Sequence, residues 1–339
     1  MTSRPTLPLR FQMRQNLDPS KVAIVIPLYN DEPHIERAIL SALKQECPSG
    51  ISLEVIVVDD CSTDSGYEIA KSLEDVHPNL RVLKQSINQG PSAARNLALS
   101  QTDAGWFTPQ DSDDIVLPDR LSKLLATAIE NNLDWVADNL LISQEASPQS
   151  IERNLWPEKP DGPIPLTAEF FVERSFEVET PRSELGFIKP LFNRLAMKDG
   201  DSPYLNELRF GEDFELYTRL LLDGTKAWLI DPCGYYLVQR AGSASHSQAG
   251  RDHRRLAAIS ARMSKRPGIS PDAKSALKAH AAYSQREAAI WAWMDGVRQR
   301  DVSLTLSAFS FSVDASLNLL GTIMKQVLRK LLPARSITE

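Results

Sequence analysis

The sequence has few cysteines, no long apolar run and no excess of positive charge over its 339 residues. The three cysteines, Cys47, Cys61 and Cys233, are isolated and odd in number, which excludes a disulfide framework and suits a reducing cytosol. No stretch reaches the roughly 18 uncharged apolar residues expected of a membrane span. The net charge of −6, with no basic run that interleaves aromatics, argues against a general nucleic-acid binder.

The composition is otherwise that of an ordinary globular protein, with 42% hydrophobic and 24% charged residues. The length allows one large domain and an appendage. Residues 1–20 are polar and lack the apolar core of a secretory signal, so we expect an N-terminal arm there. Beyond His246 the sequence becomes rich in Ala, Arg and Lys and predicts helices near 271–294 and 315–332.

Short β-branched runs alternate with amphipathic segments in the first half of the chain. This alternation predicts a mostly parallel α/β sheet whose strands are joined by right-handed crossovers. The expected strands are 22–26, 53–58, 80–83 and a stretch at Trp106, and the helices between them are 35–43, 64–73 and 92–99. Later stretches predict strands over 133–142, 227–230 and 234–239, and helices over 117–129, 167–174 and 211–222.

Polar residues collect at the ends of the first four predicted strands. They are the segments 29–32, 59–60, 88–90 and 111–114. In parallel α/β sheets, ligands bind beyond the carboxyl ends of the strands. We therefore expect these four segments to form one binding site.

The last of these segments, Asp111-Ser112-Asp113-Asp114, has two interpretations. Carboxylates this close repel one another unless a cation neutralises them, and oxygen ligands favour Mg²⁺ or Mn²⁺. Alternatively, the segment is an acidic turn that precedes a helix, with Asp113 or Asp114 near its N-cap. The convergence of four polar strand ends favours the metal site.

Five motifs, in order, make the sequence resemble the inverting family 2 glycosyltransferases of the GT-A fold. They are Val25–Asn30, Val57–Asp64, Asn88–Asn96, Asp111–Asp114 and Gly211–Asp213. The resemblance implies a Rossmann-like, mostly parallel sheet flanked by helices over 21–245, followed by a C-terminal helical extension over 246–339. The segments Lys189-Pro190 and 211–222 further resemble bacterial transferases of the succinoglycan type.

The resemblance assigns the nucleotide to the first two strand ends. It implies that Asp60 binds a uracil-type base, that Tyr29 stacks on it and that Pro27 contacts it through the backbone. Asn30 and Glu32 are weaker candidates for nucleotide contacts. The alternatives are structural: Asp60, Asn30 and Glu32 also fit turn or helix capping, and Tyr29 fits a buried aromatic.

The diphosphate and its metal are assigned to the next two strand ends. Gly90 lets the backbone approach the nucleotide closely, and Arg95 either neutralises phosphate or pairs with the acidic turn. The structural alternative for Arg95 is a solvated arginine on a helix. The family's D-x-D pattern matches Asp111 and Asp113. This match implies a Mn²⁺ or Mg²⁺ ion, for which Asp113 is the more direct ligand and Asp111 contacts both metal and donor.

The catalytic base of the family matches Asp213. A carboxylate there would take the proton of the acceptor hydroxyl as its oxygen attacks the anomeric carbon. Its neighbour Glu212 would face another way, since successive helix residues do not share a face. Alternatively, both acids only complement the dipole at the start of the helix. Arg240 and the loop 243–245 resemble a lid on the phosphates, and His246 is either a metal or phosphate contact or a surface residue.

The implied activity is transfer of one sugar, as by a hexosyltransferase, from a nucleotide-diphosphate sugar, preferably a UDP-sugar. The acceptor would be a saccharide or a lipid-linked saccharide in bacterial exopolysaccharide or cell-surface polysaccharide biosynthesis. The Gln-x-x-Arg-Trp signature of processive synthases is absent after Asp213, which favours single transfer over polymerisation. Two alternatives are a sugar nucleotidyltransferase, disfavoured because no Gly-rich loop follows the first strand, and a non-catalytic nucleotide-sugar-binding protein.

The C-terminal helices predict an interaction whose partner stays open at this stage. Apolar residues dominate between Leu304 and Leu332, and Lys325, Arg329 and Lys330 lie toward the end. Such a helix suits packing or a homodimer contact, and also peripheral contact with an anionic membrane surface. We expect a cytoplasmic enzyme that is at most peripheral at the inner face of the membrane.

Overall fold

The computed structural model describes residues 17–176, 185–240 and 249–331 of the chain. It contains two compact units, Met1–Ala241 and Gly242–Glu339. The predicted boundary at 245–246 falls in a stretch outside the described residues and stays a prediction. The first strand already begins at Asp18, so the last three residues of the predicted N-terminal arm are strand residues.

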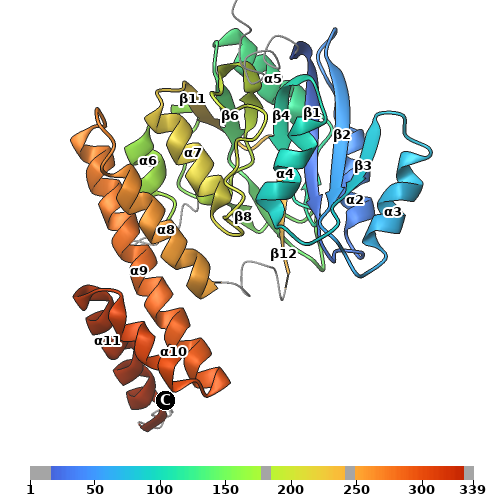
Figure 1. Cartoon of the computed structure of the whole chain (residues 1–339). Coiled ribbons are helices and arrows are strands. Elements are labelled where there is room, and N and C mark those ends of the chain that lie inside the picture. The colour runs from blue at the N-terminus through green and yellow to red at the C-terminus, as the bar shows by residue number, and fades with distance from the viewer. Residues whose placement is uncertain (1–16, 177–184, 241–248, 332–339) are drawn as a thin grey trace, which may run out of the picture. The chain divides into compact units, whose positions relative to one another are not determined.

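The first unit is built on an eight-stranded sheet with the order β3-β2-β1-β4-β10-β6-β11-β9 (Figure 1). Its strands are β1 (Asp18–Leu28), β2 (Ser52–Asp59), β3 (Leu80–Lys84), β4 (Ala104–Pro109), β6 (Trp135–Asp138), β9 (Ile164–Pro165), β10 (Leu191–Asn193) and β11 (Ala227–Ile230). Neighbours among β1 to β4 pair in parallel, as do β6 and β11. The two short strands β10 and β9 run antiparallel to their neighbours. The expected mostly parallel α/β sheet is confirmed.

An aromatic cluster holds the antiparallel strand β10 in the middle of this sheet. Phe192 of β10 stacks on Phe107 of β4 with ring centroids 4.9 Å apart, and lies 5.7 Å from Trp135 of β6. Tyr217 covers the same ring from a helix at 5.5 Å. Aromatic pairs of this geometry add about 0.5–1.5 kcal/mol each beyond their burial, so this cluster fixes the two halves of the sheet to each other.

The predicted single strand over 133–142 is wrong, because the chain changes sheet in the middle of it. Its first part is β6, and its second part, β7 (Leu141–Gln144), joins a four-stranded sheet with the order β5-β12-β7-β8. Asn139 makes the break: its side chain exchanges hydrogen bonds of 2.9 and 3.0 Å with the backbone of Trp156. The other strands of this second sheet are β5 (Ile115–Val116), β8 (Arg153–Asn154) and β12 (Tyr235–Gln239).

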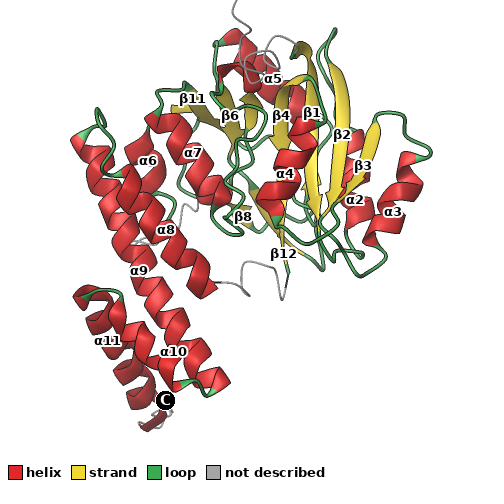
Figure 2. Cartoon of the chain, in the orientation of Figure 1, coloured by secondary structure: helices red, strands yellow, loops and turns green. Residues whose placement is uncertain are grey.

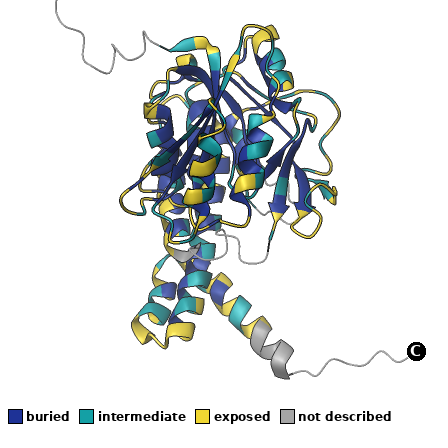
Figure 3. Cartoon of the chain, turned by 90° about the vertical axis from the view of Figure 1, so that its right-hand side faces the viewer, coloured by how far each residue is buried: buried dark blue, intermediate teal, exposed yellow. Residues whose placement is uncertain are grey.

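Helices flank the sheet, as Figure 2 shows. They are α2 (Ile35–Leu43), α3 (Gly66–Glu74), α4 (Pro91–Ser100), α5 (Arg120–Glu130), α6 (Ala168–Glu173) and α7 (Glu212–Leu222), with 3₁₀ turns at Leu185–Phe187 and Arg194–Ala196. In α2 the apolar residues Ile35, Ala38, Ile39 and Ala42 recur at helical spacing and are all fully buried. Burial of an isoleucine contributes roughly 1.5–3 kcal/mol. The strands themselves are buried along most of their length (Figure 3).

The C-terminal unit is helical, as predicted, but it contains more helices than the two expected. Its elements are α8 (Ala249–Met263), α9 (Pro271–Gln299), α10 (Val302–Ser307), a 3₁₀ turn at Ala308–Ser310 and α11 (Val313–Leu331). Ser270 caps α9 by accepting a hydrogen bond from the Ala273 amide at 3.0 Å. Among the described residues, no helix is long and apolar enough to cross a membrane.

Candidate active site

The carboxyl ends of β1, β2 and β4 bring three of the predicted polar segments together. The amide of Asp60, just after β2, donates to the carbonyl of Leu28 at the end of β1 at 2.8 Å. The amide of Gln110, just after β4, donates to the carbonyl of Val25 at 3.0 Å. Because β1 lies between β2 and β4, its end is the centre of the site.

Asp60 is buried and uses both carboxylate oxygens to shape the loop after β3. Its Oδ1 accepts from the Gln89 amide at 2.7 Å, and its Oδ2 accepts from the Gly90 amide at 2.7 Å. Burial raises the pKa of this carboxyl despite these hydrogen bonds. Gly90 has φ +92°, where an added Cβ would also lie 3.0 Å from Cγ of Arg209. Both residues therefore support the loop that faces the predicted nucleotide.

Asn30 and Glu32 cross-link the ends of β1 and β2. Asn30 has φ 49°. Its backbone amide donates to Ser62 Oγ at 3.0 Å, and its side-chain Oδ1 accepts from the Thr63 backbone amide at 2.8 Å. Glu32 accepts from the Ser65 amide at 3.1 Å. These contacts give both side chains a role in loop geometry.

Tyr29 and Pro27 lie on the same edge in different surroundings. Pro27 is within β1, opposite Val58 of β2. The side chain of Tyr29 is half exposed, at 50%, so it is not the buried aromatic of the structural alternative. An exposed ring at a strand end leaves a face available for stacking.

The acidic turn divides into one buried acid and two that are more accessible. Asp114 is buried and accepts from the Tyr235 hydroxyl at 2.7 Å and the Val238 amide at 2.9 Å. Desolvation and the charges of Asp113 and Asp111 raise its pKa well above the ordinary value. Asp114 therefore anchors the turn to β12.

Asp111 is bridged by two buried cations to the acids at the start of α7. Arg95 Nη2 lies 2.9 Å from Asp111 Oδ1, and Arg95 Nη1 lies 2.7 Å from Glu212 Oε1. Lys189 Nζ lies 2.9 Å from Asp111 Oδ2 and 2.9 Å from Asp213 Oδ2. Arg95 thus pairs with the acidic turn, one of its two predicted roles, and Lys189 makes the matching link to Asp213.

The neighbouring charges shift the pKa values of Asp111, Lys189 and Glu212. Desolvation alone would raise the pKa of Asp111, but the cations Lys189 and Arg95 hold it below its ordinary value. Desolvation would likewise lower the pKa of Lys189, yet the charges of Asp111 and Asp213 raise it above the usual range. Desolvation and the charge of Asp213 raise the pKa of Glu212. Lys189 is therefore a permanent cation here.

Asp213 stands at the start of α7 with one carboxylate oxygen in an ion pair and the other without a hydrogen-bond partner among the described residues. Its Oδ2 is paired with Lys189, while its Oδ1 is buried and has no hydrogen-bond partner among the described residues. Arg95 Nη1 lies 4.0 Å from Oδ1. The left-handed Gly211, at φ 74°, precedes the helix and turns these acids inward.

A second network holds Asp113. Arg240 directly follows β12. Its Nε lies 2.8 Å from Asp113 Oδ2, and its Nη1 lies 3.0 Å from Asp31 Oδ1. His34 Nδ1 contacts the same Asp31 oxygen at 2.6 Å, and His34 Nε2 contacts Glu145 at 2.8 Å. Desolvation and the charge of Asp111 raise the pKa of Asp113. Arg240 was predicted as part of a lid on the phosphates, which stays a prediction; in the structure it pairs with the acidic turn, and 243–245 and His246 lie outside the described residues.

Four of these residues were not among the candidates from sequence. Lys189 entered only through a local resemblance, and its distance of 24 positions from Asp213 gave no sign of contact. Asp31 lay inside the polar segment 29–32 after the first strand, which was a usable signal, whereas His34 lay two positions beyond that segment. Glu145 lies in a turn that no pattern marked.

The donor set fits a metal ion only if the substrate supplies part of the coordination. No group of three or more His, Cys, Asp or Glu side chains in the described part of the chain is arranged to hold a metal. Both oxygens of Asp111 are in ion pairs, whereas only Oδ2 of Asp113 is in one. Mg²⁺ and similar ions are often held by one or two carboxylates together with substrate phosphates. Asp113 fits that arrangement.

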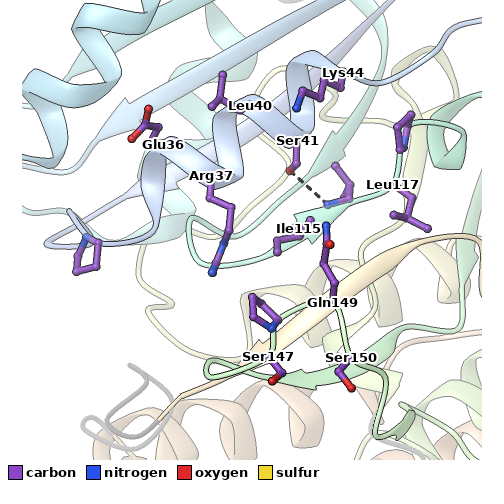
Figure 4. Close-up of a pocket in the computed structure, with 14 residues that line it drawn as sticks. Glu36, Arg37, Leu40, Ser41, Lys44, Ile115, Leu117, Ser147, Gln149 and Ser150 are labelled. Atoms are coloured by element: carbon purple, nitrogen blue, oxygen red, sulfur yellow. Dashed lines mark hydrogen bonds between the residues drawn. The ribbon is translucent and has the colours of Figure 1, made fainter.

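A groove of about 800 Å³ lies beside this site, between α2 and the turn that joins β7 to β8 (Figure 4). It is lined by Pro33, Glu36, Arg37, Leu40, Ser41, Lys44, 115–118 and 147–150. Arg37 connects the two, because its Nη2 donates to the backbone carbonyl of Asp113 at 2.8 Å. None of the predicted donor or catalytic residues lines the groove, so the ion-pair clusters are the stronger candidate for the chemistry.

Known proteins share this sequence pattern and fold. The family model "Glycosyl transferase family 2" matches residues 23–175. The succinoglycan biosynthesis protein ExoU of Rhizobium meliloti (strain 1021) is 33% identical over 265 residues, which cover 77% of this chain and 75% of ExoU. ExoO of the same strain, also named for succinoglycan biosynthesis, is 32% identical over 66% of this chain and 62% of its own length.

Solved structures agree on the fold. The structure of S. aureus TarS 1-349 in complex with UDP-GlcNAc matches with a TM-score of 0.58 at 22% identity, covering 91% of this chain and 81% of that one. The mannosyltransferase PcManGT of Pyrobaculum calidifontis, in complex with GDP-Man and Mn²⁺, matches with a TM-score of 0.54 at 20% identity, covering 95% and 88%. The chain has the GT-A fold, as expected. It belongs to glycosyltransferase family 2, and it is a glycosyltransferase, which removes both the nucleotidyltransferase and the non-catalytic alternative.

Proposed function

We propose that this enzyme transfers one sugar, with inversion, from a UDP-sugar to a saccharide or lipid-linked saccharide acceptor in the synthesis of a bacterial surface polysaccharide. Support for the pathway comes from ExoU, which is named for succinoglycan biosynthesis. Support for the donor comes from TarS, whose solved complex contains UDP-GlcNAc. The missing Gln-x-x-Arg-Trp signature supports single transfer.

One observation carries the catalytic assignment: a carboxylate oxygen of Asp213 that has no hydrogen-bond partner among the described residues. A general base needs a carboxylate oxygen that is free to accept a proton and held in one direction. Asp213 Oδ1 is buried without a hydrogen-bond partner among the described residues, while Lys189 holds Oδ2. We assign Asp213 as the base and Lys189 as the residue that positions it.

The proposed reaction uses the two oxygens of Asp213 in different roles. Asp213 Oδ1 takes the proton of an acceptor hydroxyl while that oxygen forms a bond to the anomeric carbon of the donor. The bond between the anomeric carbon and the diphosphate oxygen breaks in the same step, and the electron pair leaves with the nucleoside diphosphate. Attack opposite the leaving group inverts the anomeric configuration.

Cationic side chains of this chain would offset the negative charge of the leaving diphosphate. Arg240 lies beside Asp113, and Arg95 and Lys189 lie beside Asp111. Preorganised charges in a site with little water stabilise developing charge more strongly than water does. A Mn²⁺ or Mg²⁺ ion, held by Asp113 with Asp111 adjacent, would supply further stabilisation of the diphosphate when bound.

The nucleotide would bind at the ends of β1 and β2. Tyr29 offers an exposed ring face for the base, and Pro27 offers backbone. Asp60, Asn30, Glu32 and Gly90 would act by holding the two loops around that base. The three separate cysteines are free thiols, which suits the cytoplasm, where we place the enzyme.

Donor screening by thermal shift tests this proposal. UDP-, GDP- and dTDP-sugars are added to the full chain with and without Mn²⁺. We expect a UDP-sugar with Mn²⁺ to raise the melting temperature most, because a ligand that binds only the folded state stabilises it. If no nucleotide shifts the melting temperature, the donor assignment fails. If UDP-sugars act equally well without metal, only the metal assignment fails.

A further inference from the structure

Charge is distributed unevenly along this chain. Residues 242–339 contain 15 Lys and Arg against 7 Asp and Glu, which gives this stretch a formal charge of +8. Because the whole chain carries −6, the first 241 residues carry −14. Charge asymmetry between two parts of a chain indicates that the basic part meets an acidic surface.

The same C-terminal unit exposes an apolar stripe on α11. Val313, Leu317, Leu320 and Met324 are 78%, 64%, 47% and 63% exposed. Their spacing of four, three and four positions places them along one face of the helix. Large apolar side chains in a continuous row at this exposure mark a contact surface.

The opposite face of α11 already has its partner within the unit. Ala315 and Leu319 are buried in a cluster that includes Ala289 and Ala292 of α9. Packing therefore accounts for one side of the helix. The stripe needs a second explanation, since none of its four residues belongs to a buried cluster of the described chain.

Basic residues follow the stripe directly. Lys325 is exposed, and the sequence continues with Arg329, Lys330 and Arg335, with no acid between Asp314 and Glu339. An apolar helix face next to basic residues is the pattern of a helix that lies in the interface of an anionic bilayer. Each basic residue near such a surface strengthens binding by roughly fivefold, from about 1 kcal/mol per residue.

We propose that α11 docks this enzyme on the surface of a bilayer with anionic headgroups, with the stripe in contact with the acyl region. A symmetric contact between the stripes of two copies fits less well, because it would bring together two C-terminal units that each carry +8. Nucleic acid would match the charge but leaves the apolar stripe without a role. The proposal depends on neither the donor nor the acceptor of the sugar.

Vesicle flotation with the full chain tests the proposal. Vesicles of phosphatidylcholine alone are compared with vesicles that also contain phosphatidylglycerol, using the wild type and the Leu317→Gln, Leu320→Gln double variant. The matched control is the Val76→Gln, Ile129→Gln variant, which changes two apolar residues of the first unit that are 68% and 54% exposed. We expect the wild type and the control to float with the anionic vesicles, and the stripe variant to bind about tenfold more weakly.

A charge variant, with Lys325, Arg329 and Lys330 all changed to Gln, should lose anionic-vesicle binding and most of its salt dependence. Far-UV circular dichroism of each variant checks that the helices form. The proposal is overturned if the wild type ignores anionic vesicles or if the stripe variant floats as well as the control. It is also overturned if sedimentation velocity without lipid shows a wild-type dimer that the stripe variant converts to monomer.

Discussion

The ammonium of Lys189 lies 2.9 Å from Oδ2 of Asp213, while Oδ1 of that carboxylate has no hydrogen-bond partner among the described residues. Arg120 holds the backbone of Lys189 in place. The Nη2 of Arg120 donates to the Lys189 carbonyl at 2.6 Å and also lies 2.7 Å from the buried Asp138. The base is thus oriented by a cation whose own backbone is fixed. This arrangement leads to the first two predictions.

Asp213→Asn should retain donor binding and lose transfer. An amide of the same shape cannot take the acceptor proton, so kcat should fall by about 10²–10⁴-fold. The dissociation constant of the donor, from titration calorimetry, should change little. Glu212→Gln is the comparison, and it should keep a larger share of kcat. Equal losses in the two variants, or normal turnover by Asp213→Asn, would remove Asp213 from the base role.

Lys189→Met should lower both stability and kcat. Removing one partner of a buried ion pair leaves an uncompensated charge and costs roughly 3–5 kcal/mol, with the lower end expected because Asp111 is partly exposed. Urea unfolding measures the stability, and steady-state kinetics measure kcat and KM. Lys189→Arg restores the charge and should recover part of kcat. If Lys189→Met loses stability but keeps kcat, Lys189 is structural only.

Asp113→Ala should abolish the part of donor binding that depends on metal. The wild type should bind the UDP-sugar more tightly with Mn²⁺ than without it, whereas the variant should show one affinity under both conditions. Titration of donor with and without Mn²⁺ gives both values. Asp119→Ala, which changes a half-exposed acid nearby in sequence, serves as the control and should behave as the wild type. An unchanged metal effect in Asp113→Ala would return the turn to its structural alternative.

His280 should make the C-terminal unit sensitive to acid. Burial, with a smaller effect of His253, lowers the pKa of His280 to about 3, while an unfolded histidine titrates near 6.5. The unfolded state then binds the extra proton between these values, so stability should fall as pH drops below about 6.5 by up to ~1.4 kcal/mol per pH unit.

His280→Gln tests this, since glutamine can keep a hydrogen bond to Ser260, which lies 2.8 Å from Nδ1 of the histidine. Urea unfolding followed by helical circular dichroism at pH 5 and pH 7 should show a smaller difference in the variant. The same pH dependence in both proteins would assign the acid sensitivity to other groups.

Local pattern was sufficient for most elements of the fold. The β-branched runs and amphipathic spacing located β1 to β4 and the helices α2 to α5, because each depends on neighbouring residues that alternate or recur in one segment. It failed at 133–142, where Asn139 binds the backbone of Trp156 and splits one apolar run between two sheets. It also missed α8, whose sequence resembles the rest of the basic C-terminal region.

The sequence predicted one part of the candidate site, and the other part depended on the tertiary structure. The amino-acid sequence alone determined which acids lie at strand ends, since the end of a strand is a local property: Asp60, Asp111 and Asp113 were all found there. The tertiary structure alone decided how those acids are neutralised. For Arg95 the sequence had left two roles open, and the structure shows the ion pair with Asp111. The contacts of Lys189 join distant parts of the chain, because ion pairs depend on distance in space. Chain order gave no sign that one lysine would hold the acidic turn and Asp213 together.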